Sequence, residues 1–334
     1  MLKMSKRTPD AALLEGFLDA TRAAAASVAS LVGGGDGLRI DGVAVDALRS
    51  ALEDLAVDGL VVVGEGEKDQ APMLFVGERF GTGSGPAIDL AVDPVDGTKL
   101  AATGRPDSVA VIAVAPRGAM FDIGPAYYLE KLVSARAGAG LSLADPVAVT
   151  LTTLASRLGR PVEELRVAVQ ERPRNEQYAR AVVAAGARLV SFADGDVALS
   201  LRAAASDGDL DLLLGIGGAP EGILTAAAVR ALDGWMAVRF APQSAQERTR
   251  LIDDHVNLER EFTLGELCRK NAWLILSAVT STALAAGHEL AGVRADDDGS
   301  IVVESVVVGP GSPLTRSRKR LDPQSSPGVP GPVR

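Results

Sequence analysis

The sequence predicts an α/β protein, because strand-like and helical segments alternate along it. Apolar segments at 167–170, 188–192 and 211–216 have the character of strands, and helical spacing begins after each of them, near Asn175 and at Asp196 and Pro220. This alternation is typical of α/β folds. With 334 residues, of which 47% are hydrophobic, the chain can bury a sizeable core.

Two amphipathic helices are predicted in the N-terminal part, over residues 10–32 and 43–57. The first has a long apolar face, but Glu15, Asp19 and Arg22 interrupt it. These charges distinguish it from the apolar stretch of a secretory signal sequence.

Short buried strands are predicted next, at 60–63 and 87–92, and each leads into an acidic segment. Residues 109–114 and 120–121 then have the pattern of a hairpin around Arg117-Gly118. The expected sheet therefore has acidic residues following two of its strands.

A change of pattern near residues 141–146 predicts a boundary between two lobes. We expect an N-terminal α+β lobe over 1–145, a C-terminal α/β lobe over 146–321 and a disordered tail over 322–334. The tail contains four prolines in thirteen residues.

The negative charge of the chain lies in one segment. Residues 36–96 contain thirteen acidic and four basic residues, so this segment accounts for the whole formal charge of −9. Crowded carboxylates repel one another and resist burial, and cations relieve both effects. An acidic chain without a basic stripe argues against nucleic-acid or membrane-surface binding. A single cysteine excludes a disulfide framework and fits a cytoplasmic location.

Asp93-Pro94-Val95-Asp96-Gly97-Thr98 places two carboxylates three residues apart. Pro94 stiffens the turn, and Gly97 permits a tight path into a helix that begins near Thr98. Carboxylate oxygens are hard ligands that select Mg²⁺ or Mn²⁺. An ordinary Asp-Gly turn with a helix cap is the alternative.

Glu65, Glu67 and Asp69 follow the other strand and share one side of an extended chain. Taken alone, this segment reads as a solvated acidic loop. Because both acidic segments follow buried strands, a sheet would bring them together, which favours a common metal site.

A glycine-rich segment, 215–222, follows the strand at 211–216 and contains Gly218, Pro220 and Glu221. Pro220 suits a first helical turn, and the N–H groups before it suit a phosphate. Glu221 at that position is a candidate metal ligand, or a charge that compensates the helix dipole.

Four segments in order resemble class II (GlpX-type) fructose-1,6-bisphosphatases, within the inositol-monophosphatase-like superfamily of metal-dependent, lithium-sensitive phosphatases. They are the GEGEKDQAPML stretch at 64–74, the AVDPVDGT stretch at 91–98, Asp194-Gly195-Asp196 and the GIGGAPEG stretch at 215–222. The resemblance implies a layered αβαβα sandwich and a gluconeogenic sugar bisphosphatase that uses Mg²⁺ or Mn²⁺.

The resemblance also implies which residues form the site. The metal ligands fall on Asp41, Glu65, Asp93, Asp96 and Glu221. The substrate contacts fall on Asp96, Gly97, Thr98, Tyr128, Arg172, Pro173, Arg174, Asp194, Gly195, Asp196 and Gly218. Asp93 and Asp96 with Glu221 would form one metal site, and Asp41 with Glu65 another.

The expected reaction is hydrolysis of the 1-phosphate of fructose 1,6-bisphosphate by metal-activated water. Thr98, with Glu67 or Asp69, is the candidate group that orients or deprotonates that water. The arginine pair Arg172 and Arg174 matches a distal phosphate, although two solvated arginines at a strand end would look the same. We expect no nucleic-acid or membrane partner, and we expect the chain to form a homo-oligomer.

Two other functions are also consistent with the sequence. The substrate could be sedoheptulose 1,7-bisphosphate or an inositol phosphate. A lysine of the family is replaced by Gly37, which leaves a catalytically degenerate sugar-phosphate-binding protein as the third possibility.

Overall fold

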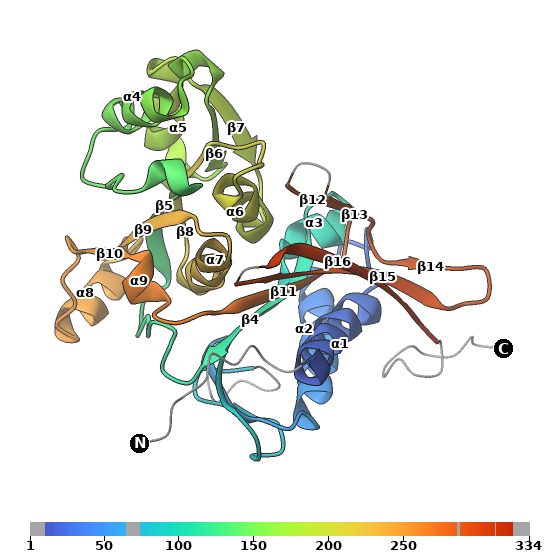
Figure 1. The fold of residues 1–334 in the computed structure, drawn as a ribbon. Coiled ribbons are helices and arrows are strands. Elements are labelled where there is room, and N and C mark those ends of the chain that lie inside the picture. The colour runs from blue at the N-terminus through green and yellow to red at the C-terminus, as the bar shows by residue number, and fades with distance from the viewer. Residues whose placement is uncertain (1–10, 65–73, 286–287, 311, 323–334) are drawn as a thin grey trace.

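The computed structural model describes residues 11–64, 74–285, 288–310 and 312–322. Within these ranges the chain forms two large sheets and a small β-hairpin, β12 (Thr282–Ala285) with β13 (His288–Leu290). Figure 1 shows helices outside and between the two large sheets.

The first sheet has eight strands among the described residues, in the order β14-β15-β11-β4-β3-β1-β2, with β16 also paired to β15. Their bounds are β1 Asp58–Val63, β2 Arg79–Phe80, β3 Ala87–Asp96, β4 Val109–Pro116, β11 Trp273–Ala278, β14 Arg294–Ala295, β15 Ile301–Gly309 and β16 Ser312–Leu321. β1 and β3 run parallel, whereas β3, β4, β11 and β15 alternate in direction.

The second sheet has six strands in the described part of the chain, in the order β10-β9-β5-β8-β6-β7. Their bounds are β5 Tyr128–Ser134, β6 Arg166–Gln170, β7 Arg188–Phe192, β8 Leu212–Gly218, β9 Trp235–Phe240 and β10 Glu261–Thr263. The strands predicted at 167–170, 188–192 and 211–216 correspond to β6, β7 and β8.

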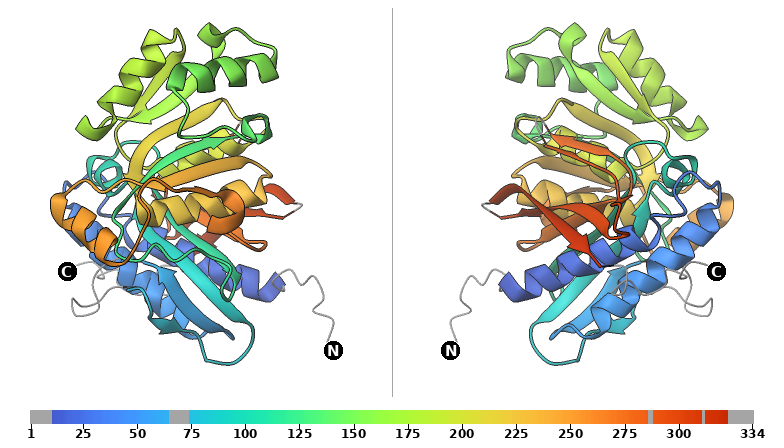
Figure 2. Two further views of the ribbon diagram at one scale, coloured as in Figure 1. Left: turned by 90° about the vertical axis from the view of Figure 1, so that its left-hand side faces the viewer. Right: turned by 90° about the vertical axis from the view of Figure 1, so that its right-hand side faces the viewer.

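Helices cover these sheets in three layers, seen edge-on in Figure 2. The helices are α1 Ala11–Ser27, α2 Gly37–Glu53, α3 Thr98–Thr103, α4 Val147–Leu158, α5 Glu176–Ala184, α6 Asp196–Ala204, α7 Ala219–Ala231, α8 Ala245–Asp253 and α9 Leu264–Leu267. α1 and α2 pack on the outer face of the first sheet, α6 and α7 lie between the sheets, and α4 and α5 cover the second sheet. This is the predicted αβαβα sandwich.

The apolar side chains form one core per interface. Phe17 and Ile112 belong to the core beneath α1 and α2, Leu224 and Leu274 to the core between the sheets, and Leu151 to the core beneath α4. Since α6 and α7 are buried between the sheets, the residues at their N-termini are held rigidly.

Two predicted elements are wrong in detail. The helix predicted over 43–57 is α2 and begins at Gly37, because the Asp36 side chain caps it by accepting the Arg39 N–H at 3.0 Å. The predicted hairpin does not form, because β4 is flanked by β3 and β11, and Met120 bridges to Cys268 instead.

The sheets do not divide at residue 145. β5, which precedes that position, belongs to the second sheet, whereas β11, β15 and β16 return to the first. The lobe boundary stays a prediction, and 323–334, most of the predicted tail, lies outside the described residues. No helix within those residues is long and apolar enough to span a membrane.

Candidate active site

A cavity of about 520 Å³ opens where β5 begins and where β6 and β8 end. Tyr127 and Gln170 are among the residues that line it. Nine of the predicted site residues also line it: Asp96, Tyr128, Arg172, Arg174, Asp194, Gly195, Asp196, Gly218 and Glu221. The fold therefore brings together residues that are up to 125 positions apart in the sequence.

Asp96 ends β3, and two glycines allow its loop to approach the start of α6. Gly97 and Gly195 have φ values of 80° and 74°, which favour glycine. A Cβ on Gly195 would lie 2.7 Å from the Asp107 carbonyl oxygen, and one on Gly97 would lie 3.3 Å from it. As a result, Asp96 Oδ2 accepts the Val197 N–H at 3.1 Å.

Two further glycines at the end of β8 make room for carboxylates. A Cβ on Gly218 would lie 1.9 Å from Glu221 Oε2, and one on Gly217 would lie 2.6 Å from Asp196 Oδ2. Glu221 stands in the first turn of α7, which contains Pro220 near its start as the sequence predicts. A side chain at either position would displace the carboxylate from its place against the strand backbone.

Asp196 is paired with a buried cation. Lys131, on β5, is 2% exposed and forms an ion pair with Asp196, which is 5% exposed. Asp196 Oδ1 and Glu221 Oε2 are buried and have no hydrogen-bond partner among the described residues. Each such oxygen is unfavourable unless a ligand or cation satisfies it.

Burial raises the pKa of the Asp96 carboxyl well above its usual range, and the neighbouring charges of Asp196 and Glu221 raise it further. Burial and the charge of Asp196 likewise raise the pKa of Glu221. These carboxyl groups therefore lie together where their ionised form is unfavourable, which is typical of functional sites.

Four other predicted residues, Asp41, Asp93, Gly97 and Thr98, are not among those that line this cavity. Thr98 Oγ1 lies 2.7 Å from Asp41 Oδ1 and 2.9 Å from the Val95 carbonyl oxygen. Burial raises the pKa of Asp41, the Thr98 hydroxyl opposes this, and the charge of Asp194 adds to it. Asp93 is buried and accepts the Val95 N–H at 3.0 Å.

The arginine pair is held in fixed positions. Arg172 forms an ion pair with Asp194 at 2.8 Å. Arg174 donates to the Ile216 carbonyl oxygen at 3.0 Å, and its guanidinium lies 4.8 Å from the centre of the Tyr128 ring. Pro173 instead borders a neighbouring depression of about 350 Å³.

The predicted residues Glu65, Glu67 and Asp69 lie outside the described residues. Among the residues that are described, no group of three or more His, Cys, Asp or Glu side chains could hold a metal ion as it stands. The donor chemistry nevertheless fits a hard cation, because Glu221 Oε2 and Asp196 Oδ1 are oxygen ligands that have no partner in the described ranges.

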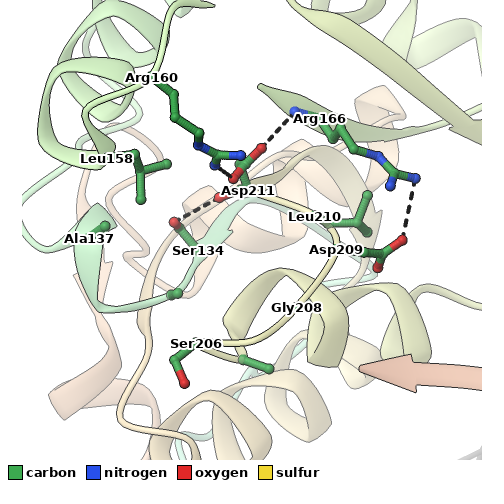
Figure 3. Close-up of a pocket in the computed structure, with 12 residues that line it drawn as sticks. Ser134, Ala137, Leu158, Arg160, Arg166, Ser206, Gly208, Asp209, Leu210 and Asp211 are labelled. Atoms are coloured by element: carbon green, nitrogen blue, oxygen red, sulfur yellow. Dashed lines mark hydrogen bonds and ion pairs between the residues drawn. The ribbon is translucent and has the colours of Figure 1, made fainter. Parts of the chain in front are cut away.

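A second cavity, of about 470 Å³, lies at the opposite end of the second sheet (Figure 3). Its charged side chains are mutually paired, Arg160 with Asp211 and Arg166 with Asp209. None of its described side chains has a buried polar atom without a partner. The first cavity is therefore the better candidate for an active site.

Comparison with known proteins agrees with this geometry. A sequence family described as "Bacterial fructose-1,6-bisphosphatase, glpX-encoded" matches residues 11–320. The chain belongs to this family. It is 42% identical over 225 residues to fructose-1,6-bisphosphatase 1 class 2 of Escherichia coli K12, with 67% of each chain covered. The class 2 fructose-1,6-bisphosphatases of Escherichia coli O6:H1 and Shigella flexneri match with the same identity and coverage.

Family membership supports fructose-1,6-bisphosphate hydrolysis as the activity of the chain, and the family is a kind of phosphatase that uses divalent metals. The sequence did not identify Tyr127 or Gln170 as part of this cavity, or Lys131 as the partner of Asp196. A signal for Lys131 was present, since Glu130-Lys131 interrupts an otherwise apolar strand.

The raised pKa values give a prediction for the metal-free protein. Asp96, Glu221 and Asp41 keep protons in the folded state that they release when unfolded. The free energy of unfolding should therefore fall as the pH rises from about 4 through the folded-state pKa values. Thermal unfolding in EDTA at pH 5.5 and 8.0 should show the lower Tm at pH 8.0.

Adding Mn²⁺ should raise the Tm more at pH 8.0 than at pH 5.5, because ionised carboxylates bind the cation. The substitution Asp96→Asn should weaken both trends. Equal pH dependence in the two proteins would contradict the assignment of this effect to the buried carboxylates.

Proposed function

We propose that the chain hydrolyses the 1-phosphate of fructose 1,6-bisphosphate in the cavity lined by Asp96 and Glu221, releasing fructose 6-phosphate and phosphate. The observation that carries this proposal is the set of carboxylates that line the same cavity as Arg172 and Arg174, with two buried oxygens that have no partner within the described part of the chain. In a member of this family, that combination suits a cation on one side of a sugar bisphosphate and a phosphate on the other.

The proposed metal is Mg²⁺ or Mn²⁺, with Asp41, Glu65, Asp93, Asp96 and Glu221 as the proposed ligands. When bound, such an ion lowers the pKa of water and neutralises phosphoryl charge. The crowding of negative charge around Asp96 supports a cation here, because a cation relieves the repulsion that raises the pKa of Asp96.

The protein groups would share the remaining tasks. Arg172 and Arg174 would bind the distal phosphate through their guanidinium forks, and Asp194 and Asp196 would accept hydrogen bonds from sugar hydroxyls. Thr98, which lies 2.7 Å from Asp41, would orient the attacking water, with Glu67 or Asp69 as the candidate base. Gly97, Pro173, Gly195 and Gly218 would shape the backbone around these groups.

Phosphate release from fructose 1,6-bisphosphate tests the proposal directly. Activity should require Mg²⁺ or Mn²⁺, stop in EDTA and fall in lithium. Sedoheptulose 1,7-bisphosphate and an inositol monophosphate in the same assay test the alternative substrates. Thermal stabilisation by the sugar bisphosphate without any phosphate release in Mn²⁺ would instead identify a binding protein.

Two broader assignments are also proposed. A cytoplasmic location rests on the single buried thiol, Cys268, and on the sugar phosphate substrate. A homo-oligomer is proposed from the family resemblance, and light scattering of the purified chain would test it.

A further inference from the structure

Helix α8 contains a buried carboxylate that reaches the wall of the candidate active site. Glu247 is 1% exposed, and its Oε1 accepts the N–H groups of Tyr127 at 2.8 Å and Tyr128 at 3.1 Å. Its Oε2 accepts the Gln243 N–H at 2.9 Å. Hydrogen bonds to an ionised acceptor are about twice as strong as neutral ones, so these bonds tie the start of β5 firmly to α8.

The two tyrosines held in this way line the cavity. Their carbonyl oxygens accept the backbone N–H groups of Ala219 at 2.9 Å and Ala241 at 3.1 Å. Glu247 thus binds the N–H groups of Tyr127 and Tyr128, whose carbonyl oxygens are bonded to the start of α7 and to the residue after β9. Without Glu247, only the carbonyl oxygens of these two residues would keep their hydrogen bonds.

The same helix also holds the ring of the outer tyrosine. Arg250 Nη1 donates to Tyr127 Oη at 2.7 Å, and its guanidinium lies 5.9 Å from the ring centre. Tyr127 is 49% exposed, so this contact fixes a side chain that would otherwise be free at the rim. Tyr128 in turn lies beneath the Arg174 guanidinium.

We propose that Glu247 and Arg250 are positioning residues for the substrate: from α8 they fix the wall formed by Tyr127 and Tyr128 and, through Tyr128, the arginine that receives the distal phosphate. This inference rests on the proposed function and deepens it. This wall favours a sugar that carries a second phosphate, because it positions Arg174 and not the carboxylates around Asp96.

A purely structural role for Glu247 makes a different prediction. Glu247 also stands in the first turn of α8, where its N–H donates to the Ser244 side chain at 3.1 Å. If the buried carboxylate only stabilises the helix and its neighbours, its loss lowers the Tm without changing substrate affinity.

The experiment compares Glu247→Gln and Arg250→Gln with two controls on the same helix, Asp253→Asn and Arg248→Gln, whose parent residues are exposed. Glutamine has the size of glutamate, but it replaces one of the two oxygens that accept N–H groups with an NH₂ group. We measure kcat and KM for fructose 1,6-bisphosphate and fructose 1-phosphate in Mn²⁺. The Kd of the bisphosphate is measured by calorimetry in EDTA, where turnover is blocked.

We expect Glu247→Gln to raise the KM and Kd for the bisphosphate about tenfold, and Arg250→Gln to raise them about threefold, as the loss of one charge-assisted hydrogen bond implies. The kcat should stay within about a factor of two, and the KM for fructose 1-phosphate and both controls should be unchanged. If Glu247→Gln does not fold, Arg250→Gln carries the test, because Arg250 lies on the surface.

The inference is overturned if the variants lose Tm but keep the KM and Kd of the parent chain, or if both substrates are affected equally. If the unsubstituted chain binds the bisphosphate but releases no phosphate, only the proposed function is contradicted. The Kd ratios of the variants then still test the positioning role of Glu247 and Arg250. An unsubstituted chain that binds no bisphosphate defeats both.

Discussion

Replacing Glu221 with glutamine should lower phosphate release about 100- to 1000-fold, the loss typical of removing one group that stabilises charge in a transition state. Glu221 Oε2 is buried without a partner among the residues that the structure describes. The carboxyl lies close enough to Asp96 and Asp196 for their charges to interact. An amide of the same shape keeps the packing but removes the charge that would attract a cation. Initial rates in saturating Mn²⁺ measure the effect.

The same substitution should leave the metal-free protein as stable as before, or more stable, at pH 8.0. The charge of Glu221 contributes to the raised pKa of Asp96, so neutralising it relieves repulsion inside the fold. This opposition between activity and stability is expected where a site gathers like charges for function. Turnover equal to that of the unsubstituted chain, with a lower Tm, would rule out this role for Glu221.

Glu176→Gln is the matched control, since Glu176 also stands in the first turn of a helix that follows the end of a strand. Its side chain is 64% exposed and pairs only with Arg180 at 3.3 Å among the described residues. An exposed pair of this kind contributes little to stability. Activity and Tm should therefore stay close to those of the parent chain.

Local patterns were enough to predict the elements that carry the candidate site. The strand at 188–192 has the predicted bounds as β7, and the helices predicted to begin at Asp196 and near Thr98 are α6 and α3. These predictions depended on apolar runs bounded by glycine and aspartate. Such signals lie within a few residues of the element they define, so no long-range information was needed.

Long-range pairing decided the elements that the sequence misplaced. Asp93-Pro94-Val95-Asp96 has the composition of a turn but lies inside β3, where Asp96 pairs with Val109 of β4. The strand tolerates Pro94 for two reasons. β1 pairs with β3 only as far as Ala91, and the register with β4 is irregular between Asp93 and Asp96. Neither condition is visible from residues 93–96 alone.

Charges inside β5 were the signal that sequence reasoning passed over. Glu130 and Lys131 are adjacent and point to opposite faces of the second sheet. Glu130 accepts hydrogen bonds from Tyr178 at 2.7 Å and Arg239 at 3.0 Å, whereas Lys131 pairs with Asp196. A charged pair in a strand of otherwise apolar residues indicates buried partners on both faces, but it does not say which ones. Only the packing of α6 between the sheets assigns Asp196 to Lys131.

Replacing Lys131 with methionine should lower the free energy of unfolding by about 3–5 kcal/mol, the usual cost of leaving one member of a buried ion pair alone. Methionine fills a similar volume, so little of this loss would come from packing. Both side chains of the pair are almost fully buried, 3% exposed for Lys131 and 6% for Asp196. Water therefore cannot compensate the Asp196 carboxylate, whose Oδ1 already lacks a partner in the described part of the chain. Urea unfolding in EDTA measures the change.

The double variant Lys131→Met with Asp196→Asn separates this cause from a packing defect. If the loss arises from an uncompensated charge, removing the charge of Asp196 should restore about half or more of it, and the two substitutions will be strongly non-additive. Phosphate release should not recover, because Asp196 lines the cavity with Asp96 and Glu221. Additive losses would mean that Lys131 stabilises β5 by packing alone, and the ammonium would then have no part in holding the carboxylates together.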